Sequence, residues 1–96
     1  MNKIENVYQQ IVEIAKKNEA TKVVLFGSRA RGDNQPKSDI DIAVYGCKDF
    51  LKFEYELNEE LWSLLPLDII NMDEDNISEE LLKEIERDGV NLYVKI

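Results

Sequence analysis

The sequence predicts a small α/β (α+β) fold, a mixed sheet of about four strands with helices packed on it. Segments with helical spacing of apolar residues alternate with apolar segments of strand length, and glycine or proline stands at several junctions. The 96 residues, 44% hydrophobic and 33% charged, have the composition of a globular protein and leave no room for a second lobe. We therefore expect one domain over residues 1–96.

The N-terminal third predicts a helix, a strand and a short helix. Residues 22–26 form an apolar run that predicts a first strand, after which Gly27 turns the chain. We expect a short helix over residues 28–31, ended by Gly32. Before them, apolar side chains at helical spacing predict an amphipathic helix over residues 2–19; they are Ile4, Val7, Tyr8, Ile11, Val12, Ile14 and Ala15.

The middle of the chain predicts a loop, a strand and a helix. Residues 33–37 carry strong turn chemistry, and residues 39–45 alternate as a second strand that Gly46 closes. Residues 50–65 then predict a helix that Pro66 ends. The apolar anchors of this helix are Phe50, Phe53, Leu57, Leu61 and Leu64.

The C-terminal third predicts the remaining strand, helix and strand. Asn76 or Ser78 is the expected N-cap of the helix, and Gly89 is its expected stop. The elements are residues 67–71 as a third strand, residues 79–88 as a last helix, and residues 90–96 as a fourth strand or extended tail.

Composition excludes several classes of function. The absence of histidine removes Ser-His-Asp hydrolysis and zinc-histidine sites, so acid–base work falls to carboxylates, to metal-bound hydroxide or to the substrate. A lone cysteine, Cys47, excludes an internal disulfide and indicates a reducing cytoplasm. No apolar run approaches the roughly 20 residues that a membrane span needs. The net charge of -8 argues against extensive nucleic-acid binding, because phosphate neutralisation needs a basic face.

The most informative stretch joins a glycine turn to a pair of carboxylates. Gly27-Ser28 follows the first apolar strand, and Asp39 and Asp41 alternate with isoleucines after a spacer of ten residues, 29–38. Side chains two positions apart on a strand share one face, roughly 6.5 Å apart, so both carboxylates point to one side. A divalent cation would relieve their repulsion. This pairing indicates metal-assisted phosphoryl or nucleotidyl transfer.

The arrangement resembles the minimal nucleotidyltransferases of the DNA polymerase beta superfamily. The resemblance rests on Phe26-Gly27-Ser28 and on Asp39-Ile40-Asp41-Ile42. It implies a third carboxylate on a later strand, for which Asp68 is the candidate. It also implies the roles of the site residues: Asp39, Asp41 and Asp68 as catalytic ligands of two Mg²⁺ ions, and Gly27, Ser28 and Arg31 as the binding site for ATP or another nucleoside triphosphate.

The resemblance further implies a partner. Small prokaryotic members of this superfamily pair with HEPN-domain toxins and act as antitoxins that transfer AMP to a hydroxyl of the toxin. We therefore expect a nucleotidyltransferase of this kind in a toxin-antitoxin pair. Two alternatives stay open: a non-catalytic antitoxin subunit that only binds its partner, and a nucleotidyltransferase that modifies small molecules. Arg29 is a second candidate for the phosphate contact expected of Arg31.

Overall fold

A computed structural model describes residues 4–61 and 65–96 of the chain. It contains one four-stranded sheet with the order β3-β2-β1-β4. The strands are β1 (Lys22–Phe26), β2 (Ile40–Tyr45), β3 (Leu67–Asn71) and β4 (Val90–Val94), and the helices of the described residues are α1 (Ile4–Lys17), α2 (Ser28–Arg31), α3 (Phe50–Glu60) and α4 (Glu79–Asp88).

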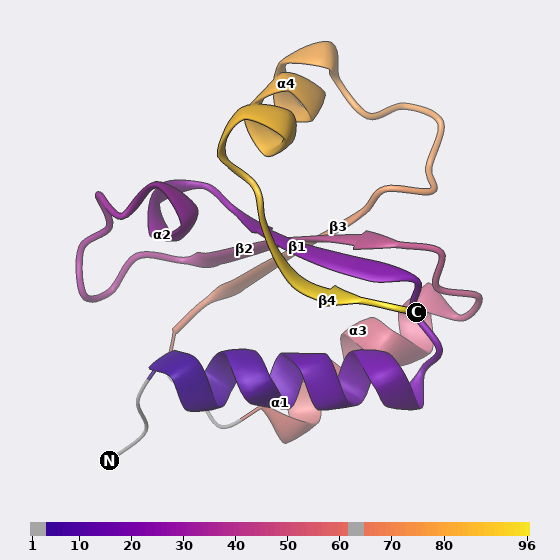
Figure 1. Cartoon of the computed structure of the whole chain (residues 1–96). Coiled ribbons are helices and arrows are strands. Elements are labelled where there is room, and N and C mark those ends of the chain that lie inside the picture. Colours follow the sequence, from indigo (N-terminus) through magenta and orange to yellow (C-terminus); the bar gives the residue numbers. More distant parts are fainter. Residues whose placement is uncertain (1–3, 62–64) are drawn as a thin grey trace.

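The sheet separates two layers of helices. α1 and α3 lie on one face and α4 lies on the other, while the short α2 sits at the end of β1 (Figure 1). Alternation along β2 explains this layering, because Ile40, Ile42 and Val44 are buried with α1 and α3, whereas Ala43 is buried with Ile85 of α4. Asp41 therefore faces the α4 side of the sheet.

Strand directions place the end of β1 beside the beginnings of β2 and β3. β1 is antiparallel to both β2 and β4, whereas β2 and β3 are parallel and joined through α3. In this register Phe26 lies opposite Asp41, and Asp41 lies opposite Asp68. The glycine turn and the two carboxylate strands thus meet at one end of the sheet.

Most predicted elements are confirmed. β1, β3, α2 and α4 have the predicted bounds, and the predicted tail is the strand Val90–Val94. β2 begins at Ile40, so Asp39 stands immediately before the strand. The cap of α4 is Ser78, whose hydroxyl accepts a hydrogen bond of 3.2 Å from the Leu81 N–H. α1 is shorter than predicted, and residues 2 and 3 of its predicted range lie outside the described residues.

The predicted length of the third helix is wrong. α3 ends at Glu60, and Leu61 has an extended backbone with ψ of 124°. Leu61 and Leu65 nevertheless pack against the core, which explains why apolar spacing continued beyond the helix. Apolar periodicity reports burial, so Leu61 and Leu65 can contribute to it without being helical. The predicted anchor Leu64 lies outside the described residues.

Candidate active site

Gly27 forms the wall of the site at the end of β1. Its φ of 76° lies in the left-handed region that glycine adopts readily. A β-carbon at this position would collide with Oδ2 of Asp41 and lie 3.2 Å from its Cγ. The turn is closed by its carbonyl oxygen, which accepts from the N–H groups of Ala30 and Arg31, both at 3.1 Å. Gly27 is therefore required both for the turn and for the close approach of the backbone to Asp41.

The three predicted carboxylates lie on one face of the sheet. Asp41 and Asp68 are directly opposite each other on the parallel strands β2 and β3, whose backbones are about 4.8 Å apart in such a pair. Asp39 precedes β2 and is two residues from Asp41, so it belongs to the same face. The sequence predicted the first pair, and the register of β3 brings the third carboxylate beside it.

Asp41 is the electrostatic centre of this cluster. Partial burial, followed by the negative charges of Asp68, Asp39 and Glu84, raises its pKa to about 6. The positive charge of Arg31 opposes these effects. Like charges on one sheet face are unfavourable without a cation between them, so the cluster is suited to bind positive charge.

The donor set fits a divalent cation that prefers oxygen ligands. Asp39, Asp41 and Asp68 supply carboxylate oxygens only, which is the chemistry of a magnesium site completed by water and phosphate. In the described residues and in the conformation shown, no three side chains of this kind converge closely enough to form a ligand group. The fit therefore rests on the type and common face of the three carboxylates.

The start of α2 offers hydrogen-bond donors beside the carboxylates. The N–H groups of Ala30 and Arg31 bond to the Gly27 carbonyl, and those of Gly32 and Asp33 bond to the Ser28 carbonyl. No hydrogen bond joins the N–H groups of Ser28 and Arg29 to another described residue. These two donors and the Ser28 hydroxyl are available to an anion at this turn.

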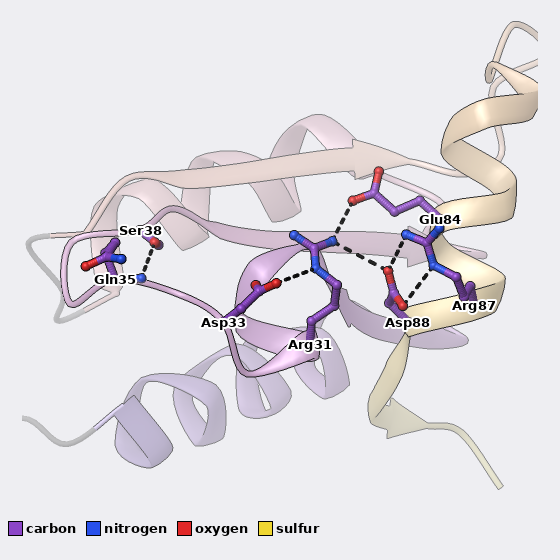
Figure 2. A network of polar contacts seen from close by, with 7 residues as sticks. All are labelled: Arg31, Asp33, Gln35, Ser38, Glu84, Arg87 and Asp88. Atoms are coloured by element: carbon purple, nitrogen blue, oxygen red, sulfur yellow. Dashed lines mark hydrogen bonds and ion pairs between the residues drawn. The ribbon is translucent and has the colours of Figure 1, made fainter.

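Arg31 is held in a network between α2 and α4 (Figure 2). Its Nε bonds to Asp33 at 3.2 Å, and its Nη1 lies 3.5 Å from oxygens of both Glu84 and Asp88. Asp88 in turn accepts from Arg87 at 2.7 Å. The structure therefore places Arg31 in ion pairs that tie α4 to α2.

Arg29 organises the loop that delivers Asp39. Its Nε donates to the Ser38 carbonyl at 3.1 Å and its Nη2 to the Pro36 carbonyl at 3.1 Å. Within this loop, the Ser38 hydroxyl accepts from the Gln35 N–H at 2.8 Å (Figure 2). Arg29 thus has a structural role in the described residues.

Sequence reasoning missed Glu84. Its charge acts on Asp41, and its carboxylate pairs with Arg31, although 43 positions separate Glu84 from Asp41 in the chain. The helical spacing of Glu84 and Asp88 predicts that both lie on one side of α4. Only the packing of α4 on the sheet shows that this side faces the site.

Comparisons with known proteins show the family to which the chain belongs. Residues 9–95 match the family described as polymerase beta nucleotidyltransferase. The chain belongs to this family and is a nucleotidyltransferase. Two proteins of Methanocaldococcus jannaschii are similar to it: "Putative protein adenylyltransferase MJ1215", 35% identical over 72% of this chain and 83% of the relative, and "Putative protein adenylyltransferase MJ0128", 36% identical over 72% of each.

Solved structures share the fold. A structure of a "putative minimal nucleotidyltransferase" has a TM-score of 0.65 and 22% identity and covers 91% of this chain and 90% of its own. A toxin-antitoxin structure with AMP-PNP has a TM-score of 0.67 and 24% identity over 92% of this chain and 73% of its own. A structure of a tri-AMPylated Shewanella oneidensis HEPN toxin in complex with an MNT antitoxin also matches. Its TM-score is 0.62 and its identity 21%, and the match covers 95% of this chain and 72% of the matched chain. These likenesses confirm the predicted fold.

The helices were also compared with the length and apolarity that a membrane span requires. Over residues 4–61 and 65–96, none is both long and apolar enough to span a bilayer.

Proposed function

We propose that this chain is a Mg²⁺-dependent protein adenylyltransferase that moves AMP from ATP to a hydroxyl of a HEPN-domain toxin. The observation that carries the proposal is the register of β2 and β3, which sets Asp41 opposite Asp68 next to the Gly27 turn. A carboxylate cluster beside free turn amides suits a metal-bound triphosphate. We place the reaction in the cytoplasm, where the single free thiol of Cys47 remains reduced.

Each site residue receives a role in this proposal. Asp39, Asp41 and Asp68 would hold two Mg²⁺ ions, which supply charge neutralisation at the attacking and leaving oxygens. The Ser28 hydroxyl and the free amides of Ser28 and Arg29 would bind the β- and γ-phosphates. Arg31 would contact phosphate after exchanging at least one of its carboxylate partners.

The transfer is a single substitution at phosphorus. The hydroxyl oxygen of the acceptor attacks the α-phosphorus of ATP, and the bond from this phosphorus to the bridging oxygen of the β-phosphate breaks. Pyrophosphate leaves with that oxygen, and the AMP moiety becomes a phosphodiester on the acceptor. The hydroxyl proton passes to the carboxylate of Asp68, an exposed side chain on the edge strand β3.

Three observations support a protein acceptor. The similar archaeal proteins carry the name of protein adenylyltransferases, and the structurally similar antitoxin is bound to an AMPylated HEPN toxin. The net charge of -8 suits a partner with a basic surface. An RNA-binding toxin has such a surface.

Labelled ATP tests the proposal directly. The purified chain, Mg²⁺ and a co-encoded HEPN-domain protein are incubated with ATP labelled at either the α- or the γ-phosphate. We expect label on the protein from the α-phosphate only, on a tyrosine, serine or threonine, and none after Asp39→Asn with Asp41→Asn. Label from the γ-phosphate would contradict AMP transfer. Tight binding without any transfer would favour a non-catalytic antitoxin, and labelling of small molecules alone would favour the other alternative.

Two further variants test the third carboxylate. Asp68→Asn is expected to bind Mg-ATP measurably while transfer falls by several orders of magnitude. Asp73→Asn is the control, because Asp73 accepts from the Gly46 N–H at 2.9 Å, at the opposite end of the sheet. Near-normal transfer by Asp68→Asn together with loss of transfer in Asp73→Asn would overturn the assignment of Asp68.

A further inference from the structure

β3 is an edge strand with backbone groups that point away from the sheet. The Ile40 N–H donates to the Pro66 carbonyl at 2.9 Å, and the Met72 N–H donates to the Val44 carbonyl at 2.9 Å. In a parallel pair with these bonds, Asp68 and Ile70 turn their N–H and C=O groups toward β2. The intervening Ile69 therefore turns both of its backbone groups outward, and no hydrogen bond to another described residue occupies them.

An open cavity of about 590 Å³ lies along this edge, between α3 and the start of α4. Apolar side chains from both helices and from β3 line it, among them Leu51, Ile69, Ile70 and Leu81. Leu51 is 76% exposed although it is a large apolar residue. We call this cavity the β3 groove.

The β3 groove has an acidic rim. Glu54 of α3 and Glu74 of the following loop both line it, and no ion pair joins either of them to a lysine or arginine of the described residues. An apolar floor with two carboxylates that have no ion pair among the described residues favours a segment that carries both apolar and basic side chains. A second copy of this chain is a poorer match, because each copy carries a net charge of -8.

We propose that an extended, basic segment of the acceptor protein adds to the free edge of β3 as a further strand. The proposal rests on the proposed function, since it concerns how that acceptor reaches the site. Strand addition satisfies both outward groups of Ile69, and the side chains of the added strand find apolar surface in the β3 groove.

The pleat then determines which acceptor residue is modified. Residues directly opposite each other on neighbouring strands project to the same face, with β-carbons about 4.5–5.5 Å apart. The acceptor residue beside Asp68 therefore points to the face that carries Asp39 and Asp41. A tyrosine, serine or threonine there presents its hydroxyl to the carboxylates. Its neighbour points to the opposite face, toward Ile69, and the next residue lies beside Ile70, so both of these are expected to be apolar.

A proline at Ile69 removes the outward N–H without removing a bond of the β2–β3 ladder. The matched control is Val94→Pro on the opposite edge of the sheet. Lys95 N–H donates to the Thr21 carbonyl at 2.8 Å, so the preceding Val94 turns its N–H outward in the same way. Two readouts are measured for each variant: affinity for the HEPN-domain acceptor by calorimetry, and transfer of labelled AMP.

We expect Ile69→Pro to weaken acceptor binding by about tenfold or more, since one carbonyl of the acceptor loses its partner. Val94→Pro is expected to bind within about twofold of the unaltered chain, and both variants to bind Mg-ATP normally. Equal acceptor affinity of the two proline variants would overturn strand addition. If Ile69→Pro binds the acceptor more weakly than Val94→Pro does, but the unaltered chain transfers no AMP, the proposed function is overturned and the docking site stands.

A chemical variant of the acceptor makes the test independent of protein folding. A synthetic peptide of the modified acceptor segment is N-methylated at alternate residues in two registers. We expect one register to abolish binding, because its methyl groups face β3, and the other to bind normally. Equal binding of both peptides would contradict strand addition. A dimer of the chain that Ile69→Pro dissolves in sedimentation experiments would assign the edge to a second copy.

Discussion

At the scale of single residues, alanine substitutions of two glycines with positive φ distinguish the cost of backbone strain from the cost of a collision within the site. Gly27 and Gly32 have φ of 76° and 85°, but only Gly27 has the Asp41 carboxylate where a β-carbon would lie. We expect Gly32→Ala to lower the free energy of unfolding by about 1–2 kcal/mol, the cost of a left-handed alanine. Gly27→Ala is expected to cost at least about 1 kcal/mol more and to remove transfer, because Asp41 is displaced.

Urea unfolding measures the loss of stability in both glycine variants, and labelling with ATP measures the loss of transfer. Equal behaviour of the two variants would contradict a role for Gly27 in the site.

The pKa of Asp41 predicts how stability depends on pH without metal. Its folded pKa of about 6 lies above the ordinary value of 3.8, so the folded state holds this proton more tightly than the unfolded state. The stability linked to that proton is complete below about pH 4 and is lost as pH rises through about 6. Asp41→Asn should therefore stabilise the metal-free protein at pH 7.5 by about 1 kcal/mol, after allowance for water at this half-buried group.

Urea unfolding in a chelator at pH 7.5 and pH 4 tests this dependence. The gain from Asp41→Asn should vanish at the lower pH. The exposed loop variant Asp75→Asn serves as the control and is expected to show no such gain. An Asp41→Asn protein that is less stable at pH 7.5 would show that the carboxylate stabilises the fold.

At the scale of elements, Gly89 shows how a correct prediction can have a different physical reason. It ends α4 as predicted, but with φ of -61°, which any residue adopts. Glycine is needed because a β-carbon would collide with the Ile85 carbonyl and lie 2.7 Å from Cγ1 of Val24. Helix stop signals were therefore readable from the sequence, whereas the close approach of α4 to β1 was not.

Gly89→Ala is accordingly predicted to act on the packing of α4. We expect a loss of about 1–3 kcal/mol in the free energy of unfolding, typical of an overpacked contact. Hydrogen exchange of the α4 amides should accelerate more than that of the β1–β2 ladder. The exposed α4 variant Lys83→Ala is the control. Unchanged stability and exchange in Gly89→Ala would contradict this contact.

Some residues of the candidate site could be predicted from local sequence patterns, whereas others depend on tertiary packing. Gly27, Ser28, Asp39 and Asp41 were predictable because a strand, a turn and alternation are local patterns. The place of Asp68 required the parallel register of β3, and the resemblance to a family supplied what local spacing does not. Glu84 and the ion pairs of Arg31 depend on how α4 packs, which short-range patterns do not encode. The end of α3 was missed because Leu61 stays against the core after the helix has ended.

At the scale of the whole molecule, the acidic charge should speed the encounter with a basic acceptor. The association rate constant is expected to fall as salt rises from low to physiological concentration, because the Debye length shortens. Stopped-flow fluorescence measures this rate. Raising salt should change the dissociation rate much less.

A pair of double variants separates local charge from total charge. Glu54→Lys with Glu74→Lys alters the rim of the β3 groove, and Glu5→Lys with Glu13→Lys makes the same change in net charge on the exposed surface of α1. The rim variant is expected to slow association and raise the dissociation rate, whereas the α1 variant should slow association only. Identical kinetics of both variants would contradict a local role for the groove.

The central position of β1 also determines when its two edges can pair with neighbouring strands during synthesis. β1 pairs with β2 and with β4, so residues 22–25 acquire their second neighbour only when residues 90–94 have left the ribosome. Every predicted ligand of the active site is made before that point. A nascent chain therefore carries its carboxylates early but exposes one edge of the apolar strand β1 until residues 90–94 emerge. Chaperone dependence and aggregation of stalled chains should be greatest in this interval and should fall once β4 emerges.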